Sequence, residues 1–75
     1  MKYDGKISFT IDKEHPDYVE NYEGLTFTFE DTYSFNDDYT EEEAVAFIKR
    51  DLSLVAGGGY NTDHIHNVTF EIERI

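Results

Sequence analysis

Hydrophobic and polar residues alternate strictly in two stretches near the ends of the chain, a period that is typical of half-buried strands. In the first stretch, KISFTI (6–11), the apolar positions are Ile7, Phe9 and Ile11. In the second stretch, HNVTFEIERI (66–75), they are Val68, Phe70 and Ile72. Each stretch therefore predicts a strand with one face in the core and one face in water.

The period changes to that of a helix between these strands and predicts an amphipathic helix over residues 41–56. Thr40 is a strong N-cap, and Glu43 lies three residues later, which completes a capping box. Glu41 and Glu42 fill the first turn, where the helix dipole favours negative charge. Gly57 is expected to end the helix in a left-handed conformation. The apolar stripe comprises Ala44, Val45, Ile48, Leu52 and Val55, with Phe47 at its margin.

The aromatic stretch LTFTFEDTYSF (25–35) returns to a period of two and leaves two interpretations open. Its apolar face comprises Leu25, Phe27, Phe29, Tyr33 and Phe35. A hairpin could turn near Glu30 and Asp31, although the three-residue turn that keeps the aromatics on one side usually needs Gly or Asn. One long or bent strand would instead point Asp31 inward.

The segment EHPDYVENYEG (14–24) predicts a short helical turn at 16–22 or an ordered loop, with Pro16 at the start and Gly24 at the end. Together these elements predict one α+β domain over residues 1–75. We expect a three- to four-stranded, mainly antiparallel sheet with the helix packed on one face.

Composition restricts the compartment and the chemistry. The chain has no cysteine, which excludes disulfides and thiolate metal sites, and its 12 aromatic residues must supply much of the core. We find no apolar run of membrane length and no signal-peptide pattern, so we expect no membrane association and a cytoplasmic location.

The net charge of −11 is concentrated in one segment. Residues 12–43 contain twelve acids and one lysine, while the five acids and five bases elsewhere cancel. This surplus argues against direct binding to nucleic acid or anionic lipid and favours a basic partner. Tyrosines, which are enriched in protein interfaces, are interleaved with the acids.

Motifs for catalysis and cofactors are weak. DHIH (63–66) places His64 and His66 on one side of an extended segment, but no third metal ligand follows at a recognisable spacing. The glycines of AGGGYN follow a helix, whereas a phosphate-binding loop precedes one. No serine lies in the context of a nucleophile, and acids in solvated turns lack the apolar pocket that raises a catalytic pKa. We therefore expect that the protein is not an enzyme and needs no cofactor, and a metal-dependent enzyme at His64 and His66 is a third, weaker hypothesis.

Carboxylates on strands, turns and a helix start can substitute for a nucleic-acid backbone. Residues on the same face of a strand lie about 6.6 Å apart, of the order of the spacing between successive phosphates. Lys and Arg groups that bind phosphate also accept carboxylate pairs. The predicted partner-binding residues are Asp17, Glu20, Glu23, Glu30, Asp31, Asp37, Asp38, Glu41 and Glu42, flanked by Tyr33 and Tyr39. We expect them to form one exterior patch.

The chain resembles small, acidic, cysteine-free α+β inhibitors of host defence from phages and other mobile elements, which include anti-CRISPR proteins that act as DNA mimics. The features that carry the resemblance are the length and the acidic stretches DKEHPDYVENYEG and EDTYSFNDDYTEEE. No family motif aligns, so no residue role is carried over. The resemblance implies a non-enzymatic inhibitor that occupies the nucleic-acid site of a basic host protein or ribonucleoprotein complex.

A second hypothesis is a small structural or assembly module that forms homo-oligomers through a sheet edge or an aromatic face. It rests on the aromatic content and on the small core of so short a chain. The sequence is compatible with a monomer or a homodimer.

Overall fold

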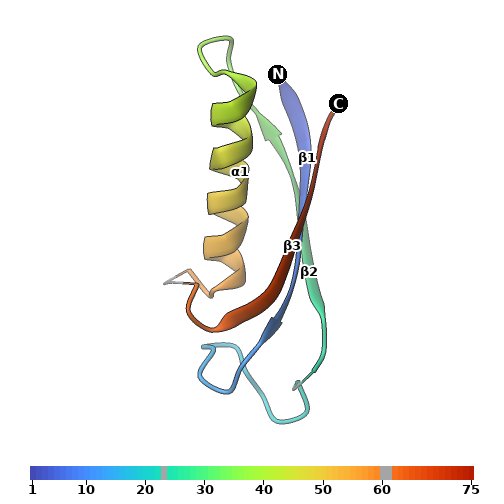
Figure 1. Ribbon diagram of the computed structural model, residues 1–75, viewed down its shortest axis with the longest axis vertical. Helices are drawn as coiled ribbons and strands as arrows, with labels where there is room; N and C mark the ends of the chain where they lie inside the picture. Colours follow the sequence, from blue (N-terminus) through green and yellow to red (C-terminus); the bar gives the residue numbers. More distant parts are fainter. Residues whose placement is uncertain (23, 60–61) are drawn as a thin grey trace.

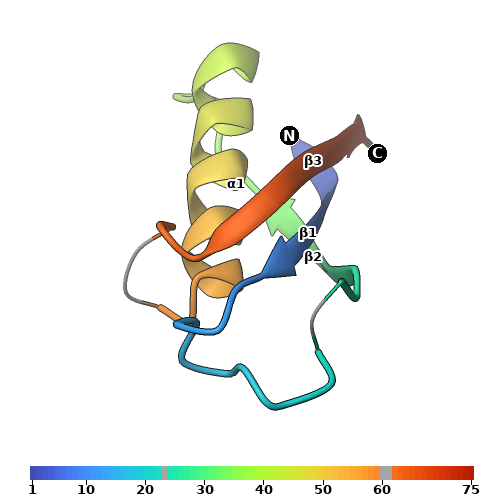
Figure 2. The ribbon, with the colours of Figure 1, turned by 60° about the horizontal axis from the view of Figure 1, so that its bottom comes forward.

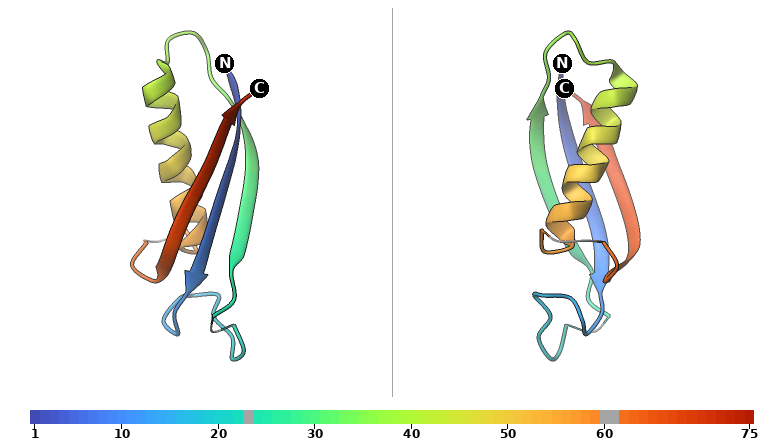
Figure 3. Two further views of the ribbon diagram at one scale, coloured as in Figure 1. Left: turned by 45° about the vertical axis from the view of Figure 1, so that its right-hand side comes forward. Right: turned by 90° about the vertical axis from the view of Figure 1, so that its left-hand side faces the viewer.

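The computed structural model describes residues 1–22, 24–59 and 62–75 and confirms the α+β architecture. Its elements are β1 (Lys2–Ile11), β2 (Phe27–Ser34), α1 (Glu41–Ala56) and β3 (Ile65–Arg74) (Figure 1). The strands form one antiparallel sheet in the order β2-β1-β3, and α1 crosses one face of it (Figure 3). In the described part of the chain, no helix combines the length and hydropathy needed to cross a membrane.

The central strand β1 alternates between buried and partly exposed residues along its whole length, as a half-buried strand should. Tyr3, Ile7, Phe9 and Ile11 point toward α1 and are buried. The strand begins at Lys2, earlier than the predicted Lys6. The reason is that this N-terminal part pairs with both neighbouring strands.

The segment 25–35 forms the single strand β2 and not a hairpin. It pairs with β1 from Phe27 to Ser34 without a register shift, which excludes the turn near Glu30. Asp31 lies opposite Gly5 and therefore on the helix-facing side of the sheet, as the one-strand interpretation required. Leu25 lies before the strand and is exposed.

The predicted capping box of α1 is present. The Glu43 backbone N–H donates to Thr40 Oγ1 at 3.1 Å, and the Thr40 backbone N–H donates to Glu43 Oε1 at 3.1 Å. The buried stripe consists of Ala44, Ile48, Leu52 and Ala56. The expectation for Val55 is wrong, because its side chain is 50% exposed and Ala56 takes the core position.

The end of α1 also differs from the prediction. Gly57 has a φ of −78°, whereas the left-handed residue is Gly58 with a φ of +79°. The Gly59 N–H donates to the Leu54 carbonyl at 2.7 Å, and the Gly58 N–H donates to the Val55 carbonyl at 3.1 Å. These two bonds form a Schellman motif, in which the left-handed residue follows the C-cap.

The long loop between β1 and β2 lies beyond the end of the sheet (Figure 2). Its predicted helical turn at 16–22 is a series of turns without a helix, in which N–H groups bond to carbonyls three residues earlier at Tyr18, Tyr22 and Leu25. Asn21 and Gly24 have φ values of 88° and 80°, which breaks the helical path.

The face of the sheet opposite α1 is open and polar. Alternation places Lys6 of β1 between Glu30 of β2 and Glu71 of β3 in one row across this face. The next row places Asp4 between Thr32 and Glu73, and the Thr32 hydroxyl donates to Asp4 Oδ1 at 2.9 Å. The β3 edge strand contains a register shift near Asn67, whose φ is 54°.

Candidate functional site

The structure divides the acidic segment 12–43 among three places, so the expected single patch is not formed. Asp17 and Glu20 lie in the loop after β1, at one end of the long axis of the molecule (Figure 1). Asp37, Asp38, Glu41 and Glu42 lie at the opposite end, in the connection to α1 and its first turn (Figure 1). Glu30 and Asp31 lie between these ends on opposite faces of β2. Glu23 lies outside the described residues.

One end therefore gathers a compact group of carboxylates, which we call the acidic cap: Asp37, Asp38, Glu41 and Glu42. All are exposed, and none accepts a hydrogen bond or forms an ion pair within residues 1–22, 24–59 and 62–75. Lys2 and Arg74 lie at strand ends on the same end of the molecule but make no ion pair with the acidic cap. The cap carboxylates thus form no ion pair with the basic residues that the structure describes.

The backbone under the acidic cap is fixed by local hydrogen bonds. The Asp38 N–H donates to Asn36 Oδ1 at 3.0 Å, and the Tyr39 N–H donates to the Asn36 carbonyl at 3.3 Å. The capping box of Thr40 then starts α1 directly after this turn. The cap is therefore preorganised on a turn and a helix start, and its acids also interact favourably with the helix dipole.

Aromatic side chains anchor the cap to the sheet. The ring centroids of Phe35 and Tyr39 lie 5.0 Å apart, and the ring centroids of Phe35 and Phe47 lie 5.6 Å apart. Tyr39 remains 40% exposed and lies next to the acids, where a partner can contact it. Tyr39 is thus a predicted partner-binding tyrosine whose ring is exposed to contact from another molecule.

Tyr33 has a structural role instead. Its hydroxyl donates to Asp51 Oδ2 of α1 at 2.7 Å, which ties β2 to the helix. Burial, with the hydrogen bond to Asp51, raises the pKa of the Tyr33 phenol well above its usual range. Asp31 lies beside this contact and accepts the Thr32 N–H at 2.8 Å. Tyr33 stays a predicted partner-binding residue, and its hydroxyl is already engaged by Asp51.

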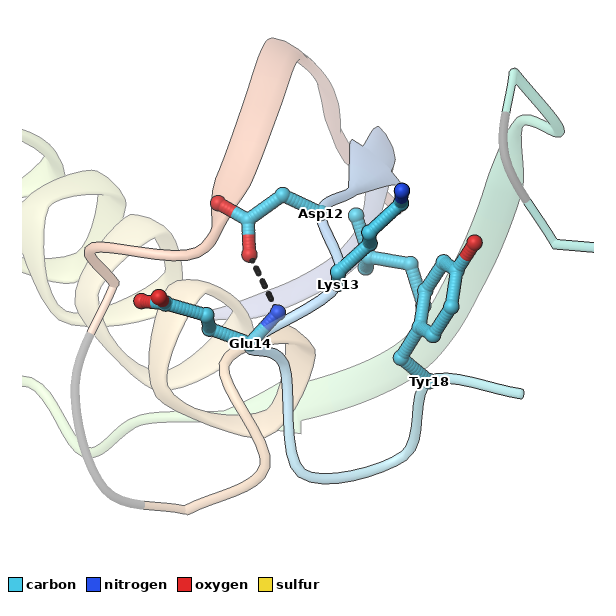
Figure 4. A pocket seen from close by; sticks show the side chains of 5 residues that line it. Asp12, Lys13, Glu14 and Tyr18 are labelled. Atoms are coloured by element: carbon cyan, nitrogen blue, oxygen red, sulfur yellow. Dashed lines mark hydrogen bonds between the residues drawn. The ribbon is translucent and has the colours of Figure 1, made fainter. Parts of the chain in front are cut away.

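A second polar cluster joins the end of β1 to the start of β3. Asp12 Oδ2 accepts hydrogen bonds from His66 Nε2 at 2.8 Å and from His64 Nδ1 at 3.3 Å. The hydrogen bond from His66 is the main cause that lowers the pKa of Asp12 to about 2. Figure 4 shows Asp12 beside Lys13, Glu14 and Tyr18, where its Oδ1 accepts the Glu14 N–H at 2.9 Å.

This cluster is a hydrogen-bonded junction. The adjacent hollow of about 430 Å³ is lined by Ile11, Asp12, Lys13, Glu14 and Tyr18. Glu14 Oε2 lies 3.9 Å from His64 Nδ1. Among the residues that the structure describes, no group of three or more His, Cys, Asp and Glu is arranged to hold a metal ion. The geometry accounts for His64 and His66 as partners of a carboxylate.

Sequence reasoning missed a third junction, at His15. This histidine is 5% exposed, and its Nε2 lies 2.6 Å from the Ala56 carbonyl while its Nδ1 accepts the Asp17 N–H at 3.0 Å. Both ring nitrogens are used, so the neutral tautomer with a proton on Nε2 fits the site. His15 therefore holds the acidic loop against the end of α1. The one available sequence signal was a histidine directly before proline in an otherwise charged loop.

The chain matches no protein-family model, no curated protein and no solved structure. We therefore infer its function from the geometry and charge of the residues described above.

Proposed function

We propose that this protein is a non-enzymatic binder that presents the acidic cap to a basic, nucleic-acid-binding protein and so inhibits it. One observation carries the proposal: the cap carboxylates are exposed, held on a defined backbone and unpaired within the described part of the chain. Such charges keep their full capacity to bind Lys and Arg side chains of another molecule.

The spacing of the cap supports recognition of groups that normally bind phosphate. Glu41 and Glu42 are consecutive in the first turn of α1, and their side chains leave the helix about 100° apart, so they can meet two different basic groups. Asp37 and Asp38 add a second adjacent pair on the preceding turn. A basic cleft can exchange its nucleic-acid backbone for these pairs, and the field of the cap would also accelerate association.

The class of target follows from this chemistry. A basic protein or ribonucleoprotein complex that holds nucleic acid in a cationic channel, such as a CRISPR effector, offers the required Lys and Arg groups. We place this encounter in the cytoplasm and assign the protein to the phage-type inhibitors that it resembles. Direct nucleic-acid binding is not part of the proposal, because the net charge is −11.

A matched pair of charge reversals tests the proposal. The cap variant carries Asp37→Lys, Asp38→Lys and Glu42→Lys, and the control carries Glu14→Lys, Asp17→Lys and Glu20→Lys in the loop at the other end. Both variants change the net charge equally, so any difference between them reports the position of the charges. If the partner binds the acidic cap, only the cap variant should lose salt-sensitive capture of the basic partner from host lysate. Equal loss in both variants, or retention in the cap variant, would contradict the proposal.

The folding of the cap variant needs its own control, since lysine in the first helical turn costs about 0.3–1 kcal/mol through the dipole. Circular dichroism and thermal unfolding establish that it is folded. A neutral variant with Asp37→Asn, Asp38→Asn and Glu42→Gln supplies the same test without charge reversal.

Self-association is the second candidate, and one observation favours it. Phe29 and Phe47 are 42% and 47% exposed, and β2 is an edge strand. A homo-oligomer that buries these rings should persist at high salt, whereas binding through the acidic cap should weaken. Light scattering across a salt titration separates the two candidates.

A further inference from the structure

β2 is a regular edge strand, and in the part of the chain that the structure describes no strand pairs with its outer side. β2 pairs with β1 alone, over eight residues and without a bulge, while the other edge strand, β3, has its register interrupted near Asn67. Proteins usually protect such edges with proline, bulges, covering loops or charged side chains, and the charges in β2 are those of Glu30 and Asp31. The sequence of β2, FTFEDTYS, contains neither proline nor lysine.

The hydrogen-bond pattern identifies the backbone groups that the edge offers. Met1 and Phe35 exchange two bonds, from the Met1 amine to the Phe35 carbonyl at 2.9 Å and from the Phe35 N–H to the Met1 carbonyl at 2.8 Å. Alternation along an antiparallel ladder then directs the backbone groups of Phe29 and Asp31 toward β1. The backbone N–H and C=O groups that point to the free edge are those of Thr28, Glu30, Thr32 and Ser34.

Charge decides which strand this edge can accept. Glu30 and Asp31 occupy the middle of β2, and Asp31 Oδ1 already accepts the outward-pointing Thr32 N–H at 2.8 Å. A second copy paired in antiparallel orientation about this centre would place these acids against their own equivalents, and like charges directly opposite are destabilising. A strand with Lys or Arg opposite Glu30 would be stabilised instead.

The two sides of β2 specify the pattern of the incoming strand. On the open face, Thr28, Glu30 and Thr32 are polar, and Glu30 lies in the row of Lys6 and Glu71. On the helix-facing side, Phe29 is 42% exposed beside the edge, and Asp31 on the same side already accepts the Thr32 N–H through Oδ1. Basic side chains therefore fit the open face, and apolar side chains fit the side of Phe29.

We propose that the free edge of β2 accepts an extended segment of a partner protein with alternating basic and apolar residues, which adds a strand to the sheet. The main-chain bonds of this segment supply affinity, and the flanking side chains supply specificity. The proposal goes beyond the acidic cap, because a chain that bound nothing through the cap could still accept a strand at β2.

A designed peptide provides the probe. An eight-residue peptide of alternating Lys and Val matches the length and both faces of β2. A peptide of the same composition with its lysines and valines in two blocks has equal charge but no alternation, and an alternating Glu–Val peptide reverses the charge. Amide NMR spectra of the full chain should show the alternating basic peptide shifting and protecting the N–H groups of Thr28, Glu30 and Ser34.

Two substitutions that flank the same lysine provide the matched control. Glu30→Lys and Glu71→Lys make the same charge change on either side of Lys6, the first at the β2 edge and the second on β3. We expect Glu30→Lys to weaken peptide binding about tenfold or more and Glu71→Lys to change it little. Thr28→Pro, which removes an outward N–H but no bond to β1, should also weaken binding.

Several results would overturn the proposal. One is that Glu30→Lys and Glu71→Lys weaken peptide binding equally. Another is that the blocked peptide or the Glu–Val peptide binds as tightly as the alternating Lys–Val peptide. A third is that the amide shifts are confined to the acidic cap. Protection of the Thr28 and Glu30 amides in a peptide-free dimer would identify the occupant as a second copy. The capture experiment tests only the acidic cap, and the peptide experiment tests only the edge of β2. A result that contradicts one proposal therefore leaves the other standing.

Discussion

Gly5 of β1 packs directly against the side chain of Ile48 of α1, which leaves no room for a side chain on the glycine. A Cβ atom built on Gly5 would lie 2.6 Å from Ile48 Cγ2, a separation that requires one of the two elements to move. Leu52 Cδ1 and Tyr33 Cε2 would each lie 3.3 Å from the same position. A glycine that would otherwise weaken a strand interior is therefore needed here for close packing.

Gly5→Ala should destabilise the domain by about 1–3 kcal/mol, because it overpacks this contact. Urea unfolding followed by circular dichroism measures the change. Ile48→Leu moves the branch point away from the contact, so Gly5→Ala should cost less in that background. An equal cost in both backgrounds would show that the loss does not arise at Ile48.

Tyr33→Phe should destabilise the domain by about 1–2 kcal/mol, because it removes the donor to the Asp51 carboxylate. Tyr39→Phe is the control: its hydroxyl donates no hydrogen bond to another described residue, and the change should stay within about 0.5 kcal/mol. Equal effects of the two substitutions in thermal unfolding would refute the assigned role of the Tyr33 hydroxyl.

The hydrogen bond between Tyr33 and Asp51 also predicts how the stability of the fold changes at alkaline pH. The pKa of Tyr33 is raised above its unfolded value of about 10, so the neutral phenol stabilises the fold. This contribution is complete below about pH 10 and is lost as the pH rises through the raised value. Absorbance titration of the wild type should reveal a tyrosine that ionises well above pH 10, and Tyr33→Phe should remove this phase.

Asp12 predicts a dependence at acid pH. Its pKa is lowered from 3.8 to about 2, so its contribution to stability is present above about pH 4 and is lost as the pH falls toward 2. Asp12→Asn should therefore flatten the change in unfolding free energy over this range. Asp17→Asn is the control, because its carboxylate accepts no hydrogen bond from the described residues. An unchanged slope in Asp12→Asn would contradict the junction with His64 and His66.

The helix could be predicted from sequence because its signals are local. Thr40 and Glu43 form their capping bonds within one turn, and the apolar period identifies Ile48 and Leu52 as buried. The terminator was misplaced by one residue, since three consecutive glycines offer several positions for the left-handed conformation. Val55 was misassigned because the core position of the last turn belongs to its neighbour Ala56, which leaves the Val55 side chain 50% exposed.

The spatial distribution of charge could not be predicted, since it depends on how β2 runs. Eight residues of strand at about 3.3 Å each carry the chain along most of the sheet, which separates the acidic loop from the acidic cap. The contact between Asp12 and His66 likewise depends on the register that pairs Ile11 with Ile65. These relationships join residues distant in sequence, and a single sequence carries no local signal for them.

The central claim is that the acidic cap occupies the nucleic-acid site of a basic partner. The most direct measurement uses the partner retained at low salt, purified and loaded with fluorescent nucleic acid, and follows displacement by anisotropy. Wild type and the loop variant with Glu14→Lys, Asp17→Lys and Glu20→Lys should displace the nucleic acid, whereas the cap variant with Asp37→Lys, Asp38→Lys and Glu42→Lys should not. Simultaneous binding of protein and nucleic acid, or equal displacement by the cap variant, would contradict the account.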